Sequence, residues 1–437
     1  MEELLCGISK VDITPPVGYY LQGHSGRNKP SKKVHDPLYL KLVCLSDKKT
    51  TLYILSSDLI GFSEEFVHNT REELKNKLKI SPENFLFTSS HTHTGPFIES
   101  TYGGKDKVDP DYLKILQKKI VGAAIESRGN MEKVNVRVGK GKVNIGIVNR
   151  RKKTKKGVYM MPNFEGPIDE DVSVIKFEKK DGTSKVILFN YTCHPTTLSA
   201  KIYEISADYP GVAQREIEKS YSGCLAMFTN GCCGDVRPAL VENGQFIGGN
   251  FEDIERMGKI LFGEVIKVSE KSISLKEVKL NSKIVNFKFQ LEDKLIPKNI
   301  KHLEEIVQSY KKQFSYFGPD IIEEWKEDMR GRIEKGEKLN NYIEGYLQFI
   351  KIGDIFILGL PGEIMVEIGI KLKEKIGKNL IIFGYSNGLI GYVPTANGIK
   401  EGGYEAGSFL YHKYPAPYSE KMESDLINEV INQFKKF

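Results

Sequence analysis

Two histidines, His91 and His93, stand two positions apart directly after a short apolar run. The run at 85–87 is typical of a buried strand, and Gly95-Pro96 breaks the chain beyond the histidines. Side chains at i and i+2 of an extended segment share one face. Two imidazoles on one face form half of a transition-metal site, or one metal ligand beside one acid–base group. A pair of hydrogen-bonded loop histidines is the structural alternative.

A third histidine, His194, also follows a predicted strand, in a chain that holds only eight histidines. Glu363 follows another strand, within a Pro-Gly-Glu sequence. Two histidines and one glutamate are a common ligand set for catalytic zinc, with one position left open for water. Zinc lowers the pKa of that water to about 7 and polarises a carbonyl group. No HExxH sequence is present, which excludes a thermolysin-type helix. The residues alone leave the pairing of such distant ligands open.

Other strand ends and loops carry further candidates. Asp58 ends a predicted strand, where it serves either a site or the cap of the next helix. The turn at 230–237 is rich in small residues, which let backbone amides approach a substrate closely. Its adjacent Cys232 and Cys233 leave a thiol nucleophile as a minor alternative to plain packing. Tyr392 comes from a glycine-rich loop.

Two more residues lie in segments that read as loops. His24 stands in a loop that contains glycines, from which it either reaches a site or faces the solvent. The basic run at 149–156 is typical of a solvated loop. Arg150 lies closest to the preceding strand, so it is the member of this run best placed to reach a pocket.

The elements that must position these residues alternate between strands and helices. This order predicts an α/β fold with mixed central β-sheets flanked by helices. We expect one catalytic domain over 1–437, with a helical insertion or lid at 297–335 that contains Trp325. The predicted strands lie at 39–45, 51–56, 85–87, 133–143, 172–178, 185–192, 224–229, 275–291 (a pair), 346–352, 355–360 and 380–383, and the main helices at 63–79, 110–127, 250–271 and 363–376.

Composition narrows the class of protein. The net charge of +7 is dispersed, and no basic stripe is interleaved with aromatic residues, so we expect no nucleic-acid partner. No apolar run reaches the roughly 18 residues of a membrane span. Six cysteines without a CxxC pair do not form a disulfide framework, and no secretory signal is visible. We therefore expect a soluble, cytoplasmic protein. The sequence leaves its oligomeric state open.

With these residues in view, the chain resembles the catalytic domain of the neutral (non-lysosomal, alkaline) ceramidases, which are zinc amidohydrolases. The resemblance spans nearly the whole sequence, and its motifs occur in the family's order. The matching motifs are the 7–16 segment that ends in Asp-Ile-Thr-Pro-Pro, Ser57-Asp58-Leu59, His91-Thr92-His93-Thr94-Gly95-Pro96, His194-Pro195-Thr196, the 230–238 turn, Pro361-Gly362-Glu363, Gly391-Tyr392 and Tyr404-Glu405-Ala406.

The resemblance implies one zinc ion and a set of roles. The implied zinc ligands are His91, His194, Glu363 and Tyr392. His93, Tyr404 and Arg150 match active-site positions of the family, and we expect them to take part in catalysis. His24 and Asp58 are our further candidates for substrate binding.

The sequence departs from the family's pattern at Arg237. The ceramidases carry there a serine that is assigned a catalytic role. The guanidinium group of Arg237 would suit a substrate with a carboxylate or a phosphate, which it can bind through two hydrogen bonds. The alternative is a structural ion pair. The chain also ends shortly after Tyr404, so we expect no immunoglobulin-like domain of the kind that follows in the ceramidases.

The expected function is therefore a zinc-dependent hydrolase that cleaves a linear amide (N-acyl) bond with zinc-activated water. Its partner would be a small-molecule amide, small or anionic rather than membrane ceramide. The alternative is a non-catalytic protein that keeps the fold and binds a ligand or another protein. Loss of the serine favours the second reading, whereas retention of all four metal positions favours the first.

Overall fold

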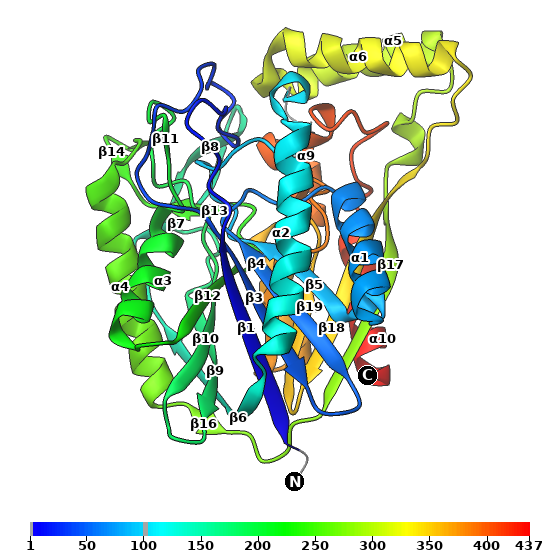
Figure 1. The fold of residues 1–437 in the computed structure, drawn as a ribbon. Helices are drawn as coiled ribbons and strands as arrows, with labels where there is room; N and C mark the ends of the chain where they lie inside the picture. The colour runs from blue at the N-terminus through cyan, green and yellow to red at the C-terminus, as the bar shows by residue number, and fades with distance from the viewer. Residues whose placement is uncertain (1–2, 99–103) are drawn as a thin grey trace.

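Two β-sheets pack face to face at the centre of the protein. The structure is a computed structural model that describes residues 3–98 and 104–437 (Figure 1). Within these residues the larger sheet has nine strands, in the order β12-β10-β9-β6-β1-β3-β4-β5 with β16 beside β6. Its strands are β1 (Leu4–Asp12), β3 (Tyr39–Ser46), β4 (Thr51–Ser57), β5 (Phe85–Ser89), β6 (Glu132–Lys142), β9 (Asp171–Lys179), β10 (Ser184–Tyr191), β12 (Leu225–Asn230) and β16 (Ile273–Ser274).

The smaller sheet has four strands in the order β17-β18-β19-β21. They are β17 (Leu280–Gln290), β18 (Tyr342–Ile352), β19 (Ile355–Gly359) and β21 (Leu380–Phe383). The core between the sheets is apolar: Ile54, Leu86 and Leu188 of the larger sheet share a cluster with Ile350 and Phe383 of the smaller. Strands buried on both faces read as continuous apolar runs, which is why their positions follow from the sequence.

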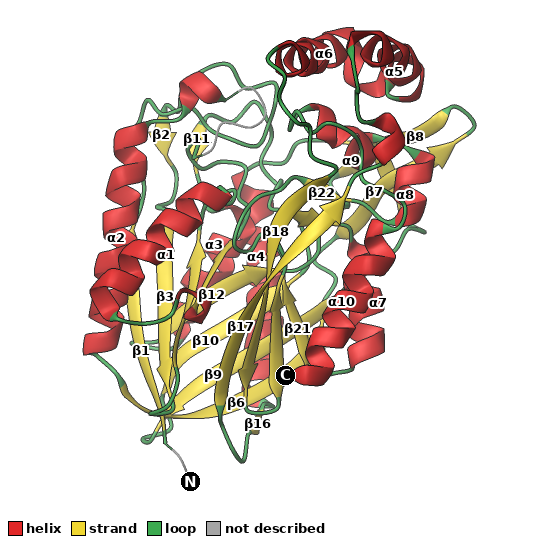
Figure 2. Ribbon diagram, turned by 90° about the vertical axis from the view of Figure 1, so that its right-hand side faces the viewer, coloured by secondary structure: helices red, strands yellow, loops and turns green. Residues whose placement is uncertain are grey.

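Helices cover the outer faces of both sheets (Figure 2). Helices α1 (Glu64–Leu78) and α2 (Pro110–Gly129) pack on one part of the larger sheet, and α3 (Asp208–Ser220) and α4 (Phe251–Glu270) pack on the other. Helices α7 (Val366–Ile376) and α10 (Met422–Lys436) cover the smaller sheet. Pairs β4–β5, β10–β12 and β19–β21 are parallel and the remaining pairs in the two sheets are antiparallel. The predicted α/β fold with mixed sheets is confirmed.

Twist brings the two ends of the larger sheet together. The hydroxyl of Ser56 in β4 donates to the carbonyl of Phe228 in β12 at 2.6 Å, although many strands separate β4 from β12 in the sheet order. Strands rotate by roughly 20–25° from one to the next, so a wide sheet coils. As a result, the segments that follow β5, β10 and β12 meet at one edge.

Two local predictions were wrong. The basic run at 149–156 is no solvated loop: most of it lies in β7 (Ile147–Thr154), which pairs with β8 (Gly157–Asn163) and β13 (Val236–Pro238). Burial of its first side chains against other segments, which charge alone does not reveal, explains the difference. Glu363 does not begin a helix but lies in β20 (Glu363–Ile364), paired in parallel with β22 (Tyr392–Val393).

The segment at 297–335 forms two helices, α5 (Ile300–Gln313) and α6 (Gly318–Glu334), joined by the short helix η4 (Ser315–Phe317). They lie at one end of the molecule, in yellow at the top of Figure 1. Their cluster around Trp325 includes Phe409, which follows α9 (Tyr404–Gly407). The minor elements are β2 (Lys33–Val34), β11 (Glu204–Ile205), β14 (Val241–Glu242), β15 (Gln245–Phe246), α8 (Ala396–Glu401) and the short helices η1 (Pro82–Asn84), η2 (Lys105–Lys107), η3 (Asp293–Leu295) and η5 (Ser408–Leu410).

Candidate active site

His91 lies in the loop that follows β5 and is fixed by backbone groups on both sides. Its backbone has φ +69°, a left-handed conformation that non-glycine residues adopt rarely and often at functional sites. Its amide donates to the carbonyl of Leu59 at 2.9 Å, and its Nδ1 lies 2.5 Å from the carbonyl oxygen of Ile60. A carbonyl can only accept, so Nδ1 carries the proton and Nε2 presents a lone pair.

His194 follows β10 and is held in the same way. Its amide donates to the carbonyl of Val236 at 3.0 Å, and its Nδ1 donates to the carbonyl of Cys233 at 2.6 Å. Burial lowers the pKa of His194 to about 4, although the hydrogen bond with Glu363 opposes this shift. The ring is therefore neutral near pH 7 and offers Nε2 as an acceptor.

The carboxylate of Glu363 faces both imidazoles. Its Oε2 lies 3.2 Å from Nε2 of His91 and 3.0 Å from Nε2 of His194. Burial by itself would raise the pKa of Glu363, but the two imidazoles outweigh burial and hold the pKa well below its usual range. Nε2 of His91, Nε2 of His194 and the Glu363 carboxylate thus converge, and none of the three carries a proton. Such a set fits a divalent cation, and the carbonyls that accept from Nδ1 of each ring fix its orientation and tautomer, as the hydrogen-bond partners of zinc-bound histidines do.

His93 lies beside this group. Its Nε2 is 3.1 Å from Nε2 of His91, and ligating nitrogens of His91, His93 and His194 all lie within 4.8 Å of one another. This buried group of three could hold a metal ion. The Nδ1 of His93, however, has no hydrogen-bond partner among the described residues, so its tautomer is not fixed like those of the other two. Burial, and then the neighbouring His91, lower the pKa of His93, which leaves it neutral.

Tyr392 reaches the same place through strand pairing, because β22 sets it directly opposite Glu363. Its ring is buried and lies 6.5 Å from the ring of His194, nearly parallel to it. Tyr404 lies at the start of α9, with its ring centroid 5.3 Å from that of Tyr392. The guanidinium of Arg150 lies over both tyrosine rings, at 5.1 and 5.5 Å from their centroids.

Glu405 fixes the position of Arg150. Its Oε1 accepts a hydrogen bond from Arg150 Nε at 2.8 Å, and its Oε2 accepts one from Arg151 Nη1 at 2.5 Å. Burial by itself would raise the pKa of Glu405, but the two guanidinium groups keep it lowered. The carboxylate is therefore ionised and supports both arginines.

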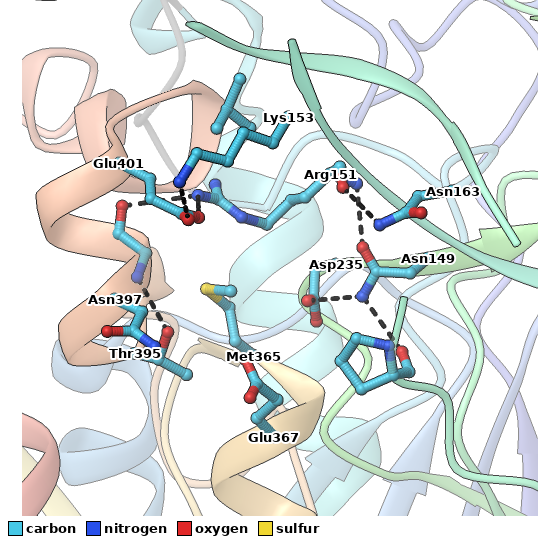
Figure 3. A pocket seen from close by; sticks show the side chains of 13 residues that line it. Asn149, Arg151, Lys153, Asn163, Asp235, Met365, Glu367, Thr395, Asn397 and Glu401 are labelled. Carbon is cyan, nitrogen blue, oxygen red and sulfur yellow. Dashed lines mark hydrogen bonds and ion pairs between the residues drawn. The ribbon is translucent and has the colours of Figure 1, made fainter. Parts of the chain in front are cut away.

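A second cavity, of about 210 Å³, opens beside Arg151 (Figure 3). There Lys153 pairs with Glu401 at 3.0 Å, and the amide of Asn149 donates to Asp235 at 2.8 Å. Asp235 also accepts from the amide of Val366 at 2.8 Å, at the beginning of α7. These contacts around the second cavity tie β7 to α8 and to the start of α7, behind the site.

The main pocket has a volume of about 250 Å³. Sequence candidates His91, His93, Arg150, Glu363, Tyr392, Tyr404, His24 and Arg237 line it, together with Gln22, Gly23, Ser25, Arg27, Ile60, Phe97, Lys107, Met160, Thr196, Tyr316, Leu389 and Tyr411. His24 packs edge-to-face on His93 with ring centroids 5.1 Å apart. Burial, followed by Arg27 and Arg237, lowers the pKa of His24 to about 3.

Asp58 is the sequence candidate that the structure places elsewhere. Its carboxylate accepts from the amide of Tyr39 at 2.9 Å and from Gln214 at 3.3 Å, and it lines a different cavity, beside Lys41. These partners lie in β3 and α3, so Asp58 has a structural role, although not as the cap of the following helix, which is Ser63.

The two adjacent cysteines lie behind the site. Burial raises the pKa of Cys232 to about 12, so this thiol stays protonated at neutral pH. Cys233 is fully buried, and its Sγ lies 3.0 Å from the hydroxyl of Tyr385. Neither lines the main pocket, which favours packing over a nucleophilic role.

Sequence reasoning missed three contributors. Tyr385 stacks on His91 with ring centroids 4.1 Å apart, Arg27 donates to the carbonyl of His93, and Tyr316 reaches the pocket from the junction of α5 and α6. Tyr385 follows the end of β21, so its place at a strand end was a usable signal. Arg27 comes from a loop and Tyr316 from η4, and the sequence does not reveal where packing places these two segments.

Comparison with known proteins identifies the family. The family described as neutral/alkaline non-lysosomal ceramidase, N-terminal, matches residues 4–248, more than half of the chain. The chain belongs to the neutral/alkaline non-lysosomal ceramidase family. The neutral ceramidase of Pseudomonas aeruginosa is 21% identical over 93% of this chain and 69% of its own length. A neutral ceramidase of Mycobacterium tuberculosis is 29% identical over 16% of this chain and 12% of its own length.

Solved ceramidase structures share the fold. The crystal structure of the neutral ceramidase from Pseudomonas aeruginosa superposes with a TM-score of 0.75 at 17% identity, over 99% of this chain and 74% of that one. A ceramidase complexed with C2 gives the same TM-score at 15% identity, over 98% of this chain and 74% of that one. In this ceramidase-family chain, none of the helices in the described ranges is long and apolar enough to cross a bilayer.

Proposed function

We propose that this ceramidase-family protein is a zinc-dependent hydrolase that cleaves a linear amide bond with water. One zinc ion would be held by His91, His194, Glu363 and Tyr392. When bound there, zinc supplies a Lewis acid for the substrate carbonyl and an activated water. The observation that carries the proposal is the convergence of two Nε2 lone pairs on the Glu363 carboxylate at 3.0 and 3.2 Å.

Groups of the chain itself are available for the oxyanion that develops when an amide carbonyl is attacked. The Arg150 guanidinium lies over the rings of both Tyr392 and Tyr404, and its Nη2 has no hydrogen-bond partner among the described residues. The proposed role of Arg150 and the Tyr404 hydroxyl is to donate hydrogen bonds to this oxygen. Because Glu405 already fixes Arg150, the donor need not reorganise during the reaction.

His93 is the proposed proton carrier. It is neutral, it lines the pocket, and its unpartnered Nδ1 is free to accept or donate. A neutral imidazole can take a proton from the attacking water, and the imidazolium formed in this way can deliver that proton to the leaving amine. His24 packs on the other side of His93 and would keep its ring in place.

The pocket favours a small or anionic substrate over membrane ceramide. Its volume of about 250 Å³ lies below the roughly 300–1,000 Å³ of pockets that enclose drug-sized ligands. Its described lining carries four cationic side chains, Arg27, Lys107, Arg150 and Arg237, and one carboxylate, Glu363.

We also propose that the whole chain works as one catalytic domain with α5 and α6 as a lid. Tyr316, between these helices, lines the pocket, and the adjacent Phe317 stacks on Tyr404 at 5.7 Å. Both residues belong to η4, so movement of this short helix would open or close one wall of the site.

The second candidate is a non-catalytic ligand-binding protein, favoured by Arg237 at the position of the serine in the resemblance. Zinc analysis of the purified protein, combined with a screen of charged and neutral N-acyl amides, tests both. We expect about one zinc ion per chain and turnover of at least one amide, with both lost in His91→Ala. A protein that binds zinc but cleaves no amide would support the second candidate, and a protein without zinc would refute the metal site.

A further inference from the structure

One wall of the main pocket carries buried polar atoms without a hydrogen-bond partner among the described residues. They are Nε of Arg237, Oγ1 of Thr196 and Nη2 of Arg150. Arg150 and Thr196 are both less than a tenth exposed, and all three residues line the pocket. Because an unsatisfied buried donor is costly, several of them on one wall indicate a group that a ligand completes.

Backbone pairing brings these three residues together beside His194. Arg237 lies in β13 opposite Val148 of β7, two positions before Arg150. Val236, next to Arg237, accepts the amide hydrogen of His194 at 3.0 Å, and Thr196 follows His194 by two positions. The wall is therefore built from the same backbone segments as the proposed metal site.

Arg237 is the unusual member of this wall. Its guanidinium carbon lies 4.3 Å from the centre of the Phe246 ring, and no carboxylate among the described residues forms an ion pair or a hydrogen bond with it. The structural ion pair, which was the alternative reading of this arginine, is thus not found in the described ranges. The nearby ring of His24 is neutral and supplies no negative charge.

We propose that Arg237 and Thr196 form a subsite for a carboxylate of the substrate, next to Arg150, whose Nη2 is left for the oxyanion. One edge of a guanidinium offers two parallel N–H donors that match the two oxygens of a carboxylate, and the threonine hydroxyl adds a third donor. The preferred substrate is then an amide that carries a carboxylate a few bonds from the scissile carbonyl. This inference rests on the proposed function for the position of the scissile bond, but not for the binding of the anion.

Binding of uncleavable probes tests the subsite separately from hydrolysis. We would use 4-oxononanoic acid and its carboxamide, ketones in which a methylene group stands where an N-acyl glycine has its amide nitrogen. Inorganic phosphate is the third probe. Dissociation constants are measured by calorimetry for the zinc-loaded protein and for Arg237→Ser, Arg237→Lys and Arg256→Gln. The last is the control, because Arg256 is an exposed arginine of α4 that pairs with Asp253.

We expect the wild type and Arg256→Gln to bind the carboxylate about ten-fold or more tightly than the carboxamide. Arg237→Ser should remove this preference, and Arg237→Lys should keep a smaller one, since a lysine retains the charge without the paired donors. Circular dichroism of each variant confirms its folding. Equal binding of the two ketones by the wild type, or an unchanged preference in Arg237→Ser, would overturn the subsite. Phosphate that binds more tightly than the carboxylate, through Arg237, would overturn the choice of carboxylate.

The result is independent of catalysis. If Arg237 selects the carboxylate but the protein cleaves no amide, the hydrolase proposal fails and the subsite stands. If amides are cleaved and the acid and carboxamide probes bind equally, the subsite fails and the hydrolase proposal stands.

Discussion

The Nε of Arg150 donates to the carboxylate of Glu405 at 2.8 Å, and both side chains are buried. This contact joins β7 to α9 and holds the guanidinium over two tyrosine rings of the pocket. Removing one member of a buried ion pair leaves the other charge uncompensated, whereas an exposed pair contributes little.

The first prediction concerns this pair. Glu405→Gln should lower the free energy of unfolding by about 3–5 kcal/mol, because Arg150 and Arg151 would both lose a charged acceptor. Glu401→Gln is the matched control, since Glu401 is partly exposed and should cost less than about 1 kcal/mol. Urea unfolding at pH 7.5 measures both. An equal loss of unfolding free energy in the two variants would show that the buried Glu405 pair stabilises the protein no more than the exposed Glu401 pair.

The second prediction concerns the metal. His91→Ala and His194→Ala should each lose most of the bound zinc, because each removes a preoriented nitrogen from the set around Glu363. His68→Ala, an exposed histidine of α1, should retain it. Elemental analysis after dialysis gives the zinc content per chain. A normal zinc content in both site variants would rule out this ligand set.

The third prediction uses Glu64, whose Oε1 is buried without a partner among the described residues. Burial, and then Glu344, raise the pKa of Glu64 to about 7. Because this folded-state value lies above the unfolded one of about 4.3, the stability linked to Glu64 is complete below about pH 4 and is lost as the pH rises through 7.

Glu64→Gln should therefore stabilise the protein at pH 8.5 relative to the wild type, by about 1–3 kcal/mol after solvent screening, and have a smaller effect at pH 5. Glu65→Gln, at the exposed neighbouring position, is the control and should show no such dependence. Urea unfolding at pH 5 and pH 8.5 measures the free energy of unfolding of each variant. An equal gain in stability for Glu64→Gln at the two pH values would refute the raised pKa.

The fourth prediction addresses the proposed lid. Tyr316 is 44% exposed and lines the pocket, so Tyr316→Ala should leave the melting temperature within about 2 °C and still raise the Michaelis constant several-fold. Phe164→Ala, at a side chain 70% exposed, controls for the loss of a surface aromatic. Steady-state kinetics with any cleaved amide provides the test. Unchanged kinetics in Tyr316→Ala would exclude η4 from substrate contact.

Much of this architecture was predictable because buried strands and capped helices have strong local signals. The run at 85–87 and the cap at Ser63 placed β5 and α1 within a residue or two. The convergence of His91, His194 and Glu363 was predicted through the family's motifs, since no spacing rule links residues so far apart in the sequence.

The remaining features depend on tertiary contacts that leave no local trace. Arg150 and Arg151 read as part of a solvated run, yet Glu405, more than 250 positions later, makes their burial tolerable. The place of Asp58 outside the pocket follows from Gln214 and Lys41, which lie in separate elements. Arg27 enters the site from a loop and Tyr316 from η4, and only packing determines where these two segments lie.

The proposed metal ligands come from the segments around both central sheets of the protein. His91 and His194 extend from the larger sheet, whereas Glu363 and Tyr392 belong to the chain around the smaller one. An ion held by all four residues would cross-link the larger sheet to the smaller one. The cross-link would close a loop of more than half the sequence. Removal of the ion with a chelator should then weaken the packing between the two sheets. Amide hydrogen exchange should become faster in β5 and β21 together, rather than in the pocket loops alone.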